Sequence, residues 1–377
     1  MINSKRICRE FETLVSFDSE SFAEYDIKEY LKEKLRTLGL TVEEDDAWKA
    51  FQPQYPKAAG NLYGFLGGNV PGEPVLFSAH MDTVSPGKGK KVIWHEDGKV
   101  TSDGTTVLGA DDVSGIVSIL EALQVIKEKN LPHPDLEIVI TVAEEAFGKG
   151  AAAFDYGKVK SRIGYFLDLT GKVGTAAVRA PSILSLNIEI IGKASHSGFA
   201  LEEGVSALTI AANAISRLPT GRVDPDTSVN FGLISGGTGK NIVPPSVHIE
   251  GEIRSLVHEK ALAQAELIEK TFREEAQRIG GRIEFEATEV LRAYDIAENE
   301  KVRKRFDKAI SQLGWDKAEY ITTFGGSDGN YFNKNGIRSI VVANAMENVH
   351  TVSEYTRISE LVRSAELTLK LMTIEEE

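Results

Sequence analysis

Residues 74–84 read Pro-Val-Leu-Phe-Ser-Ala-His-Met-Asp-Thr-Val. Its first part, Pro74–Ala79, is a short apolar run of the kind that forms a buried β-strand. A histidine, His80, and an aspartate, Asp82, come directly after this run. The stretch therefore predicts a buried strand that ends in polar side chains.

The same arrangement of an apolar run followed by polar residues recurs along the chain. Further runs rich in Ile and Val lie at Leu136–Ala143, Ile163–Leu167 and Ile340–Ala343. The polar residues that follow these runs are Glu144 and Glu145, Asp168 and, after a short loop, His350. These runs predict three more buried strands with polar ends.

Helical patterns separate the strands. Phe11–Leu38 contains one helical pattern, and Val113–Lys127 contains another in which the apolar residues lie near one side. Buried strands that alternate with helices are typical of an α/β fold. We therefore expect an open mixed sheet that is flanked by helices on both faces.

The middle of the chain, residues 179–289, has a different order of elements. The expected strand, helix, strand, strand, helix and strand are Ile183–Ile191, Val205–Leu218, Ser228–Ile234, Val247–Leu256, His258–Ile279 and Arg282–Val290. This order predicts a ferredoxin-like βαββαβ unit, with a four-stranded sheet and two helices on one face. We interpret it as an inserted α+β lid domain, and residues 1–178 and 290–377 as the catalytic domain.

The composition restricts the possible partners and the compartment. The chain has 377 residues, with 43 Lys and Arg against 56 Asp and Glu, and its net charge is −13. An acidic protein disfavours nucleic acid and membrane lipid as partners. Cys8 is the single cysteine, which excludes an intrachain disulfide and a cysteine metal site. The first 20 residues are polar, without a signal-peptide pattern, and we expect a cytoplasmic protein.

The polar residues at the strand ends indicate a metal site. In an open α/β sheet, ligands bind outside the carboxyl ends of the strands, so these side chains are expected to converge. Residues 108–112, Leu-Gly-Ala-Asp-Asp, add a further pair of aspartates before the second helical pattern. Imidazole and carboxylate groups bind zinc, and a shared carboxylate can hold two zinc ions roughly 3.5–4 Å apart. The candidate ligands are His80, Asp111, Glu145, Asp168 and His350.

Each candidate also has an ordinary interpretation. A lone histidine is usually structural, and either aspartate of the Asp111-Asp112 pair could be a helix N-cap. Glu144 and Glu145 are harder to explain in this way, because adjacent carboxylates after an apolar strand repel one another and need a cation or a proton. Without a metal, the pattern would require five coincidences at strand ends.

Four further features suggest substrate contacts. Residues 193–198, Lys-Ala-Ser-His-Ser-Gly, place His196 in a loop that could equally be an ordinary polar loop. Residues 236–241, which end at Asn241, resemble a phosphate loop, but two prolines follow and we exclude nucleotide binding. Arg254 could lie on a solvated strand face or bind a carboxylate. Residues 325–330, which include Gly326 and Ser327, could form a turn or a backbone cradle.

Together, these motifs resemble those of the di-zinc peptidase family that includes peptidase T, glutamate carboxypeptidase, succinyl-diaminopimelate desuccinylase and aminoacylase. The resemblance extends from His80 to His350 and includes the inserted lid. It rests on Ser-Ala-His-Met-Asp-Thr-Val, Gly-Ala-Asp-Asp, Ala-Glu-Glu, Asp168, Ala-Ser-His-Ser-Gly and His350. Leu-Gly-Ala-Asp-Asp and Gly-Gly-Ser-Asp-Gly are most similar to the peptidase T branch.

The resemblance implies a role for each matching residue. It implies two Zn²⁺ per subunit, with Mn²⁺ or Co²⁺ as possible substitutes. His80 and Asp168 would bind one zinc, Glu145 and His350 the other, and Asp111 both. Glu144 would be the general base, and Asp82 would orient the His80 ring. It also implies a cis peptide bond between Asp111 and Asp112.

The resemblance extends to the lid and to the quaternary structure. His196 would stabilise the oxyanion, and in this family such a histidine often comes from the partner subunit of a dimer. Asn241 and Arg254 would bind the substrate, and Gly326 and Ser327 would line the site. We therefore expect a homodimer formed through the lid domain.

The expected activity is hydrolysis of short peptides by a zinc-dependent aminopeptidase of the tripeptidase kind. An N-acyl-amino-acid amidohydrolase or a carboxypeptidase would need the same metal ligands, so the motifs do not separate these activities. A non-catalytic metal-binding relative is the alternative from another class. The presence of Glu144, Asp82 and all five candidate ligands argues against that alternative.

Overall fold

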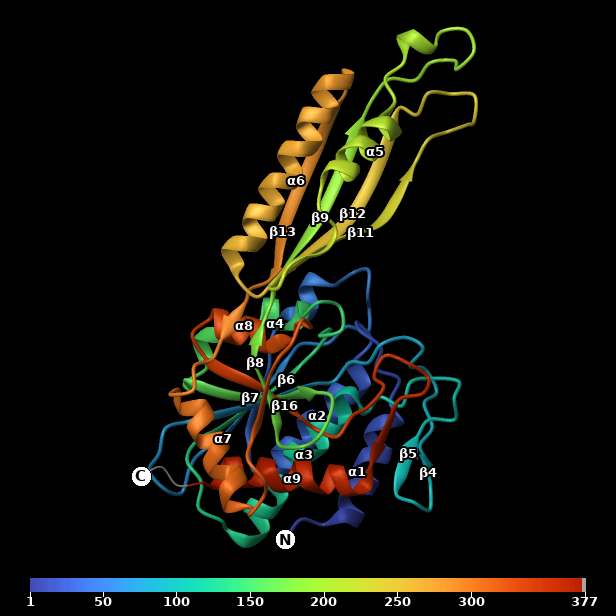
Figure 1. Cartoon of the computed structure of the whole chain (residues 1–377). Coiled ribbons are helices and arrows are strands. Elements are labelled where there is room, and N and C mark those ends of the chain that lie inside the picture. The colour runs from blue at the N-terminus through green and yellow to red at the C-terminus, as the bar shows by residue number, and fades with distance from the viewer. Residues whose placement is uncertain (375–377) are drawn as a thin grey trace. The chain divides into compact units, whose positions relative to one another are not determined.

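The computed structural model describes residues 1–374, and the chain divides into two compact units (Figure 1). Unit 1 consists of Met1–Val178, Asp295–Thr322 and the residues from Ser327 onward, and unit 2 consists of Arg179–Tyr294 and Thr323–Gly326. The chain returns to unit 1 at Asp295 and not at residue 290. The reason is that strand β13 (Arg282–Leu291) remains paired with β9 (Ser182–Ile191) as far as Leu291.

Unit 1 is built on a mixed β-sheet, as the sequence predicts. Within residues 1–374 this sheet has nine strands in the order β1-β2-β6-β3-β7-β16-β8-β14, and β15 pairs with β8. The central strands are β6 (Leu136–Thr141), β3 (Val75–His80), β7 (Ile163–Leu169) and β16 (Arg338–Ala343). These four pair in parallel, so their carboxyl ends lie at one edge of the sheet.

The outer strands surround this parallel centre. They are β1 (Thr41–Glu44), β2 (Leu62–Leu66), β8 (Thr175–Ala180), β14 (Tyr294–Asp295) and β15 (Glu319–Thr322). Strands β1, β2 and β8 pair antiparallel with their neighbours. Every residue of β3 and β6 is buried, which explains why these two strands read as continuous runs in the sequence and not as alternating ones.

Helices flank the sheet of unit 1. They are α1 (Ser4–Val15), α2 (Tyr25–Leu38), α3 (Ala110–Lys129), α4 (Lys149–Ala153), α7 (Lys301–Gln312), α8 (Asp328–Lys334) and α9 (Ile358–Thr373). Helix α3 packs against β3 and β7 and also against α1 and α9. Its residues from Ala110 to Leu123 are all buried, so the segment that begins with Asp111 is enclosed by the protein.

A small second sheet lies in the same unit, in the order β17-β5-β4. Its strands are β4 (Ile93–Trp94), β5 (Lys99–Thr101) and β17 (Tyr355–Arg357). Strand β17 follows the loop that carries His350, so this sheet anchors the carboxyl end of that loop. Among residues 1–374, no helix is long and apolar enough to cross a bilayer.

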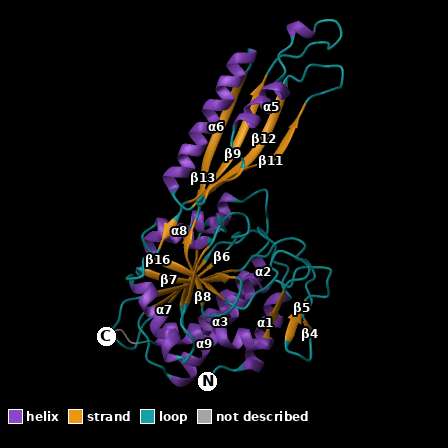
Figure 2. Ribbon diagram, in the orientation of Figure 1, coloured by secondary structure: helices purple, strands orange, loops and turns teal. Residues whose placement is uncertain are grey.

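Unit 2 has a five-stranded antiparallel sheet in the order β10-β11-β12-β9-β13. Its remaining elements are α5 (Ala207–Arg217), β10 (Gly221–Asp224), β11 (Thr227–Gly236), β12 (Ser246–Ser255) and α6 (His258–Ile279). Helices α5 and α6 contact each other and both pack on β9 and β12, so they cover one face (Figure 2). The expected βαββαβ order is present, with one extra strand. This strand, β10, is short and polar, and such a segment lacks an apolar pattern.

Candidate metal centre

The ends of the parallel strands bring the candidate ligands to one edge of the sheet. His80 is the last residue of β3, Asp168 lies near the end of β7, and Glu145 follows β6. The loop after β16 carries His350, and Asp111 lies in the first turn of α3. Segments that are far apart in the sequence thus deliver imidazole and carboxylate groups to the same place.

The first group of candidate ligands consists of His80, Asp111 and Asp168. His80 Nε2 lies 3.0 Å from Asp111 Oδ1 and 3.7 Å from Asp168 Oδ1. The ligand atoms of the group all lie within 4.8 Å of one another. Such a cluster can supply three protein ligands to one ion.

The second group consists of Asp111, Glu145 and His350. His350 Nε2 lies 3.2 Å from Asp111 Oδ2 and 3.0 Å from Glu145 Oε2. Asp111 therefore turns one oxygen toward each histidine. A carboxylate in this position can bridge two metal ions, which is the geometry of two-metal hydrolytic sites.

The charges in the site also fit divalent cations. Burial raises the pKa of Asp168 to about 6 and the pKa values of Glu145 and Asp328 to about 7. Glu145 Oε1 is buried and has no hydrogen-bond partner among the described residues. Crowded carboxylates and an unused acceptor oxygen indicate missing positive charge, and imidazole with carboxylate is a donor set that zinc accepts.

The histidines compensate for part of this negative charge. Hydrogen bonds to Asp111 and Glu145 raise the pKa of His350 to about 10. Burial opposes the charged form of His80, but its hydrogen bonds to Asp111, Asp168 and Asp82 raise its pKa well above the ordinary value. The carboxylates therefore favour the charged form of both rings.

Glu144, the candidate base, is placed through its backbone. Its N–H donates to Asp82 Oδ1 at 2.9 Å, and its carbonyl accepts the N–H of Gly148 at 2.7 Å. Burial, followed by the charge of Asp168, raises the pKa of the Glu144 carboxyl well above the usual range. A partly buried carboxyl group of this kind can accept and return a proton.

Asp82 has a wider set of contacts than the sequence suggests. His80 Nδ1 lies 3.0 Å from the main-chain carbonyl of Asp82 and 3.4 Å from its carboxylate Oδ1. The carboxylate accepts the backbone N–H groups of Glu144 and Glu145 and the hydroxyl of Ser21. The backbone of Asp82 thus orients the ring, while its side chain holds the loop after β6.

Other buried residues hold the segments of the site in place. The peptide bond between Asp111 and Asp112 is cis, as expected. Asp112 is fully buried and accepts the N–H groups of His80 and Gly115 and the side-chain amide of Asn344. Glu24 accepts the N–H of Ala143, next to the candidate base.

Glu354 is a further buried residue near the site that no pattern in the sequence reveals. It lies four residues after His350 and is buried, and its carboxylate accepts the N–H groups of Gly109 and Asp111. It follows a polar loop and not an apolar strand, so the pattern that reveals the candidate ligands does not apply to it. Only its position in the fold reveals its contacts.

In unit 2, two of the predicted substrate-binding segments lie together. The N–H of Ser197 donates to the carbonyl of Asn241 at 3.0 Å, and His196 pairs with Ile242 in an isolated β-bridge. His196 Nδ1 accepts the N–H of Gly198 at 3.1 Å. In a neutral ring the proton is then on Nε2, so this nitrogen is the available donor.

The guanidinium group of Arg254 already has hydrogen-bond partners within unit 2. Its Nε and Nη2 bind the carboxylate of Glu252 at 2.8 and 3.0 Å, and its Nη1 donates to the carbonyl of Phe324 at 2.9 Å. A guanidinium group has five N–H donors, and these bonds use three of them. Two donors are left for a substrate.

Gly326 and Ser327 have local structural roles. A Cβ atom at Gly326 would lie 2.1 Å from Leu291 Cδ1, so a larger residue there would have to displace the Leu291 side chain. Ser327 is the N-cap of α8, where its side chain takes part in a capping box with Asn330. Both residues thus have local contacts within the fold, and their role in substrate binding stays a prediction.

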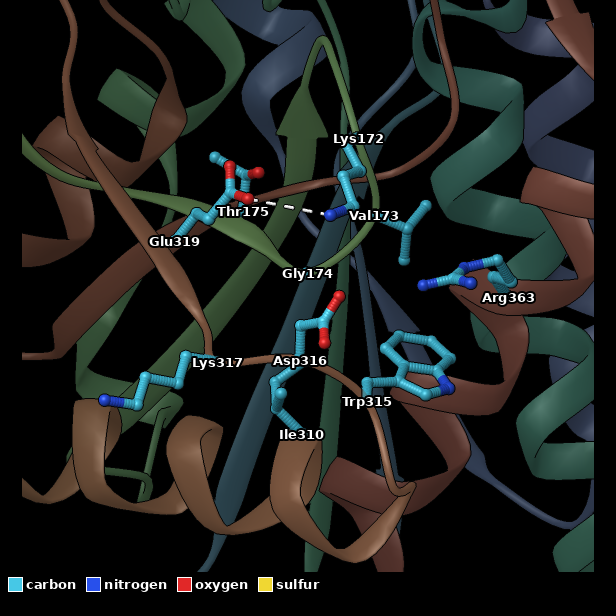
Figure 3. A pocket seen from close by; sticks show the side chains of 10 residues that line it. All are labelled: Lys172, Val173, Gly174, Thr175, Ile310, Trp315, Asp316, Lys317, Glu319 and Arg363. Carbon is cyan, nitrogen blue, oxygen red and sulfur yellow. Dashed lines mark ion pairs between the residues drawn. The ribbon is translucent and has the colours of Figure 1, made fainter.

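A separate cavity in unit 1 is too small for a peptide (Figure 3). Its volume is about 20 Å³, which is room for roughly one water molecule. Lys172, Trp315 and Arg363 line it, with the guanidinium 4.2 Å from the centre of the Trp315 ring. None of the predicted site residues contributes to this cavity, so it does not compete with the metal centre as the site of chemistry.

Comparison with known proteins gives consistent results. Residues 76–373 match the family described as Peptidase family M20/M25/M40. The chain is 41% identical to YqjE of Bacillus subtilis over 99% of both chains. It is similar to the crystal structure of aminopeptidase PepT from Bacillus cereus, with a TM-score of 0.91, 39% identity and coverage of 99% of this chain and 98% of that one. It is also similar to a tripeptidase from Staphylococcus aureus, with a TM-score of 0.93, 38% identity and the same coverage.

Proposed function

This chain belongs to peptidase family M20/M25/M40, and from this membership we propose that it is a two-metal aminopeptidase that releases the N-terminal residue of tripeptides. The observation that carries the proposal is the position of Asp111. One of its carboxylate oxygens lies near His80, and the other lies near His350. The similarity over nearly the whole chain to an aminopeptidase PepT and to a tripeptidase supports the choice of substrate.

The proposed metal ligands form two sets that share one residue. His80 and Asp168 would hold one ion, Glu145 and His350 would hold the other, and Asp111 belongs to both groups. Zn²⁺ is the proposed metal, and Mn²⁺ or Co²⁺ can take its place because nitrogen and oxygen ligands discriminate weakly among these ions. When bound, the ions would polarise the scissile carbonyl group and lower the pKa of a coordinated water.

The protein's own groups handle the protons. Glu144 takes a proton from the attacking water and passes it to the leaving amine, a transfer that suits a carboxyl group with a raised pKa. His196 donates from Nε2 to the oxygen on which negative charge develops. Asn241 and the remaining donors of Arg254 bind the polar ends of the peptide, and Gly326 and Ser327 line its path.

We also predict a homodimer formed through unit 2. Beyond residue 229, β11 pairs only with β12 among the described residues, and the side chains of Leu233 and Ile234 on this strand are 63% and 55% exposed. An exposed apolar edge strand favours pairing with another chain. The acidic composition supports the further prediction that neither nucleic acid nor a membrane is a partner. The single cysteine and the polar first 20 residues support the prediction of a cytoplasmic protein.

The experiment that tests the proposed function is a product analysis. Zn²⁺-loaded protein is incubated with unmodified, N-acetylated and C-amidated di- and tripeptides, and products are identified by mass spectrometry. We expect release of the N-terminal residue from tripeptides with a free amino end, and its loss with a chelator. Cleavage of N-acylated substrates, or removal of C-terminal residues from them, would assign the protein to deacylases or carboxypeptidases. Binding of zinc without any cleavage would contradict a catalytic function.

A further inference from the structure

The side chain of Glu354 binds the backbone of the segment that carries Asp111. Its Oε2 accepts the N–H of Gly109 at 2.8 Å, and its Oε1 accepts the N–H of Asp111 at 2.9 Å. The residue is only 1% exposed, so water does not replace these bonds. The carboxylate therefore fixes the backbone directly before the Asp111 side chain.

Glu354 also belongs to the loop that carries His350. Glu347 and Tyr355 close this loop by exchanging two backbone hydrogen bonds of 3.0 Å each. The N–H of Glu354 donates to the carbonyl of Thr351 at 3.1 Å within the loop. The side chain of Glu354 thus connects this closed loop to the start of α3.

This connection matters most for one of the two candidate metal positions. His80 and Asp168 lie on β3 and β7, which the sheet holds in register. The side chain of His350 projects from a loop and is 53% exposed, so no sheet holds it against Asp111. The distance from His350 to Asp111 depends on the contact between the loop and the start of α3.

We propose that Glu354 is a positioning residue that sets the distance between Asp111 and His350, and thereby the affinity of the metal position formed by Asp111, Glu145 and His350. The inference rests on the proposed two-metal site and adds a residue outside its ligand set. Residues that hold metal ligands in place typically change metal affinity by about 10- to 100-fold when they are replaced.

Three variants separate position from charge. Glu354→Gln keeps the shape but replaces one acceptor oxygen by an NH₂ group, so one of the two N–H donors loses its acceptor. Glu354→Asp keeps the charge but is one methylene shorter and cannot reach both donors. Glu347→Gln is the matched control, since it is the same change in the same loop and, within residues 1–374, the side chain of Glu347 makes no hydrogen bond or ion pair.

The test is a calorimetric titration of metal-free protein with Zn²⁺. His350→Ala first identifies which binding step belongs to the His350 position. We expect Glu354→Gln and Glu354→Asp to weaken that step by about 10- to 100-fold while the other step changes much less. Glu347→Gln should bind Zn²⁺ and melt like the wild type, whereas the two Glu354 variants lose a buried hydrogen bond and should melt at a somewhat lower temperature without metal.

Several results would overturn the inference. Wild-type affinity at both steps in Glu354→Gln would show that the contact does not matter for metal binding. Equal weakening of both steps with a lower melting temperature would show a general structural role. Wild-type affinity in Glu354→Asp alone would show that charge, and not position, is responsible. Fewer than two Zn²⁺ bound by the wild type would refute the two-metal site itself, and the wild-type titration alone reveals that case.

Discussion

The carboxylate of Asp82 accepts the backbone N–H of Glu144, with 2.9 Å between Oδ1 and N. Its second oxygen, Oδ2, accepts the N–H of Glu145 at 3.2 Å and the hydroxyl of Ser21 at 2.7 Å. Asp82 follows β3, and the two glutamates follow the neighbouring strand β6. One buried side chain thus positions the candidate base and a candidate ligand together.

Replacing Asp82 by Asn should therefore disturb catalysis more than folding. The amide group keeps one acceptor oxygen, but its NH₂ group faces a backbone N–H, which then has no acceptor. The loop that carries Glu144 therefore shifts. We expect kcat to fall by about 10- to 100-fold, as measured by tripeptide hydrolysis at saturating Zn²⁺. Ser21→Ala removes another partner of the same carboxylate and should have a smaller effect. An equal loss in both variants would argue against the role of the backbone contacts.

Glu144→Gln should bind both metal ions and lose most turnover. The glutamine has a similar shape but cannot accept the proton from water, and general-base catalysis contributes about 10²- to 10⁴-fold. Metal content is measured by mass spectrometry of the purified protein, and kcat with the same tripeptides. A variant that keeps near-normal kcat would show that another group is the base.

The hydrogen bond from Gly198 to His196 Nδ1 leads to a prediction about two substitutions. The amide of Gln places its nitrogen near the position of Nε2, whereas the amide of Asn places it near Nδ1. We expect His196→Ala to lower kcat by about 10²- to 10³-fold. His196→Gln should keep more activity than His196→Asn, because Nε2 is the available donor. The opposite order would assign the function to Nδ1, and wild-type activity in all three would remove His196 from the mechanism.

Arg254 and Glu252 should act together in substrate binding. Glu252 holds the guanidinium by Nε and Nη2, so the remaining donors keep a fixed direction. Arg254→Met should raise KM for tripeptides with a free carboxylate and leave KM for C-amidated peptides unchanged. Glu252→Gln should show the same selectivity to a lesser degree, and Glu250→Gln on the same strand serves as the control. A lower KM in Glu252→Gln would show that Glu252 competes with the substrate.

The pH dependence of the metal-free protein follows from His350 and Glu145. In the folded state their pKa values are raised to about 10 and about 7, above the ordinary values of 6.5 and 4.5. A group whose pKa is raised by folding stabilises the fold fully at a pH below its ordinary pKa. This stabilisation is lost as the pH rises through the pKa that the group has in the folded state. In the presence of a metal chelator, we therefore expect the protein to have a lower melting temperature at pH 9 than at pH 6.

The same pKa values predict that metal binding releases protons. At pH 7 the ring of His350 is protonated in the metal-free protein, and a metal ligand must be neutral imidazole. Calorimetry of Zn²⁺ binding in buffers with different ionisation enthalpies measures this release. An enthalpy that does not depend on the buffer would show that His350 is not protonated before metal binds.

Much of the fold and of the candidate site is predictable because the signals are local. The strand that ends at His80 is buried on both faces, so its apolar run is visible in the sequence, and so is the polar residue after it. The order of elements in unit 2 follows from segments that are long and patterned. Strand β10 is missed because Gly221–Asp224 is short and polar, and the end of the insertion is misplaced because pairing at Leu291 depends on the partner strand.

The fold class, an inserted unit and the candidate ligands can be predicted from the sequence, because apolar periodicity and the residue after a buried strand are properties of a few neighbouring positions. The buried groups that hold those candidate ligands in place are seen only in the folded chain. Glu354 binds the N–H of Asp111 across 243 positions, and Asp112 binds Asn344 across 232. Such contacts form when the parallel strands bring distant loops to one edge, and no local pattern encodes them. The physical reason is that hydrogen bonds of buried groups are satisfied by whichever chain segments folding brings near.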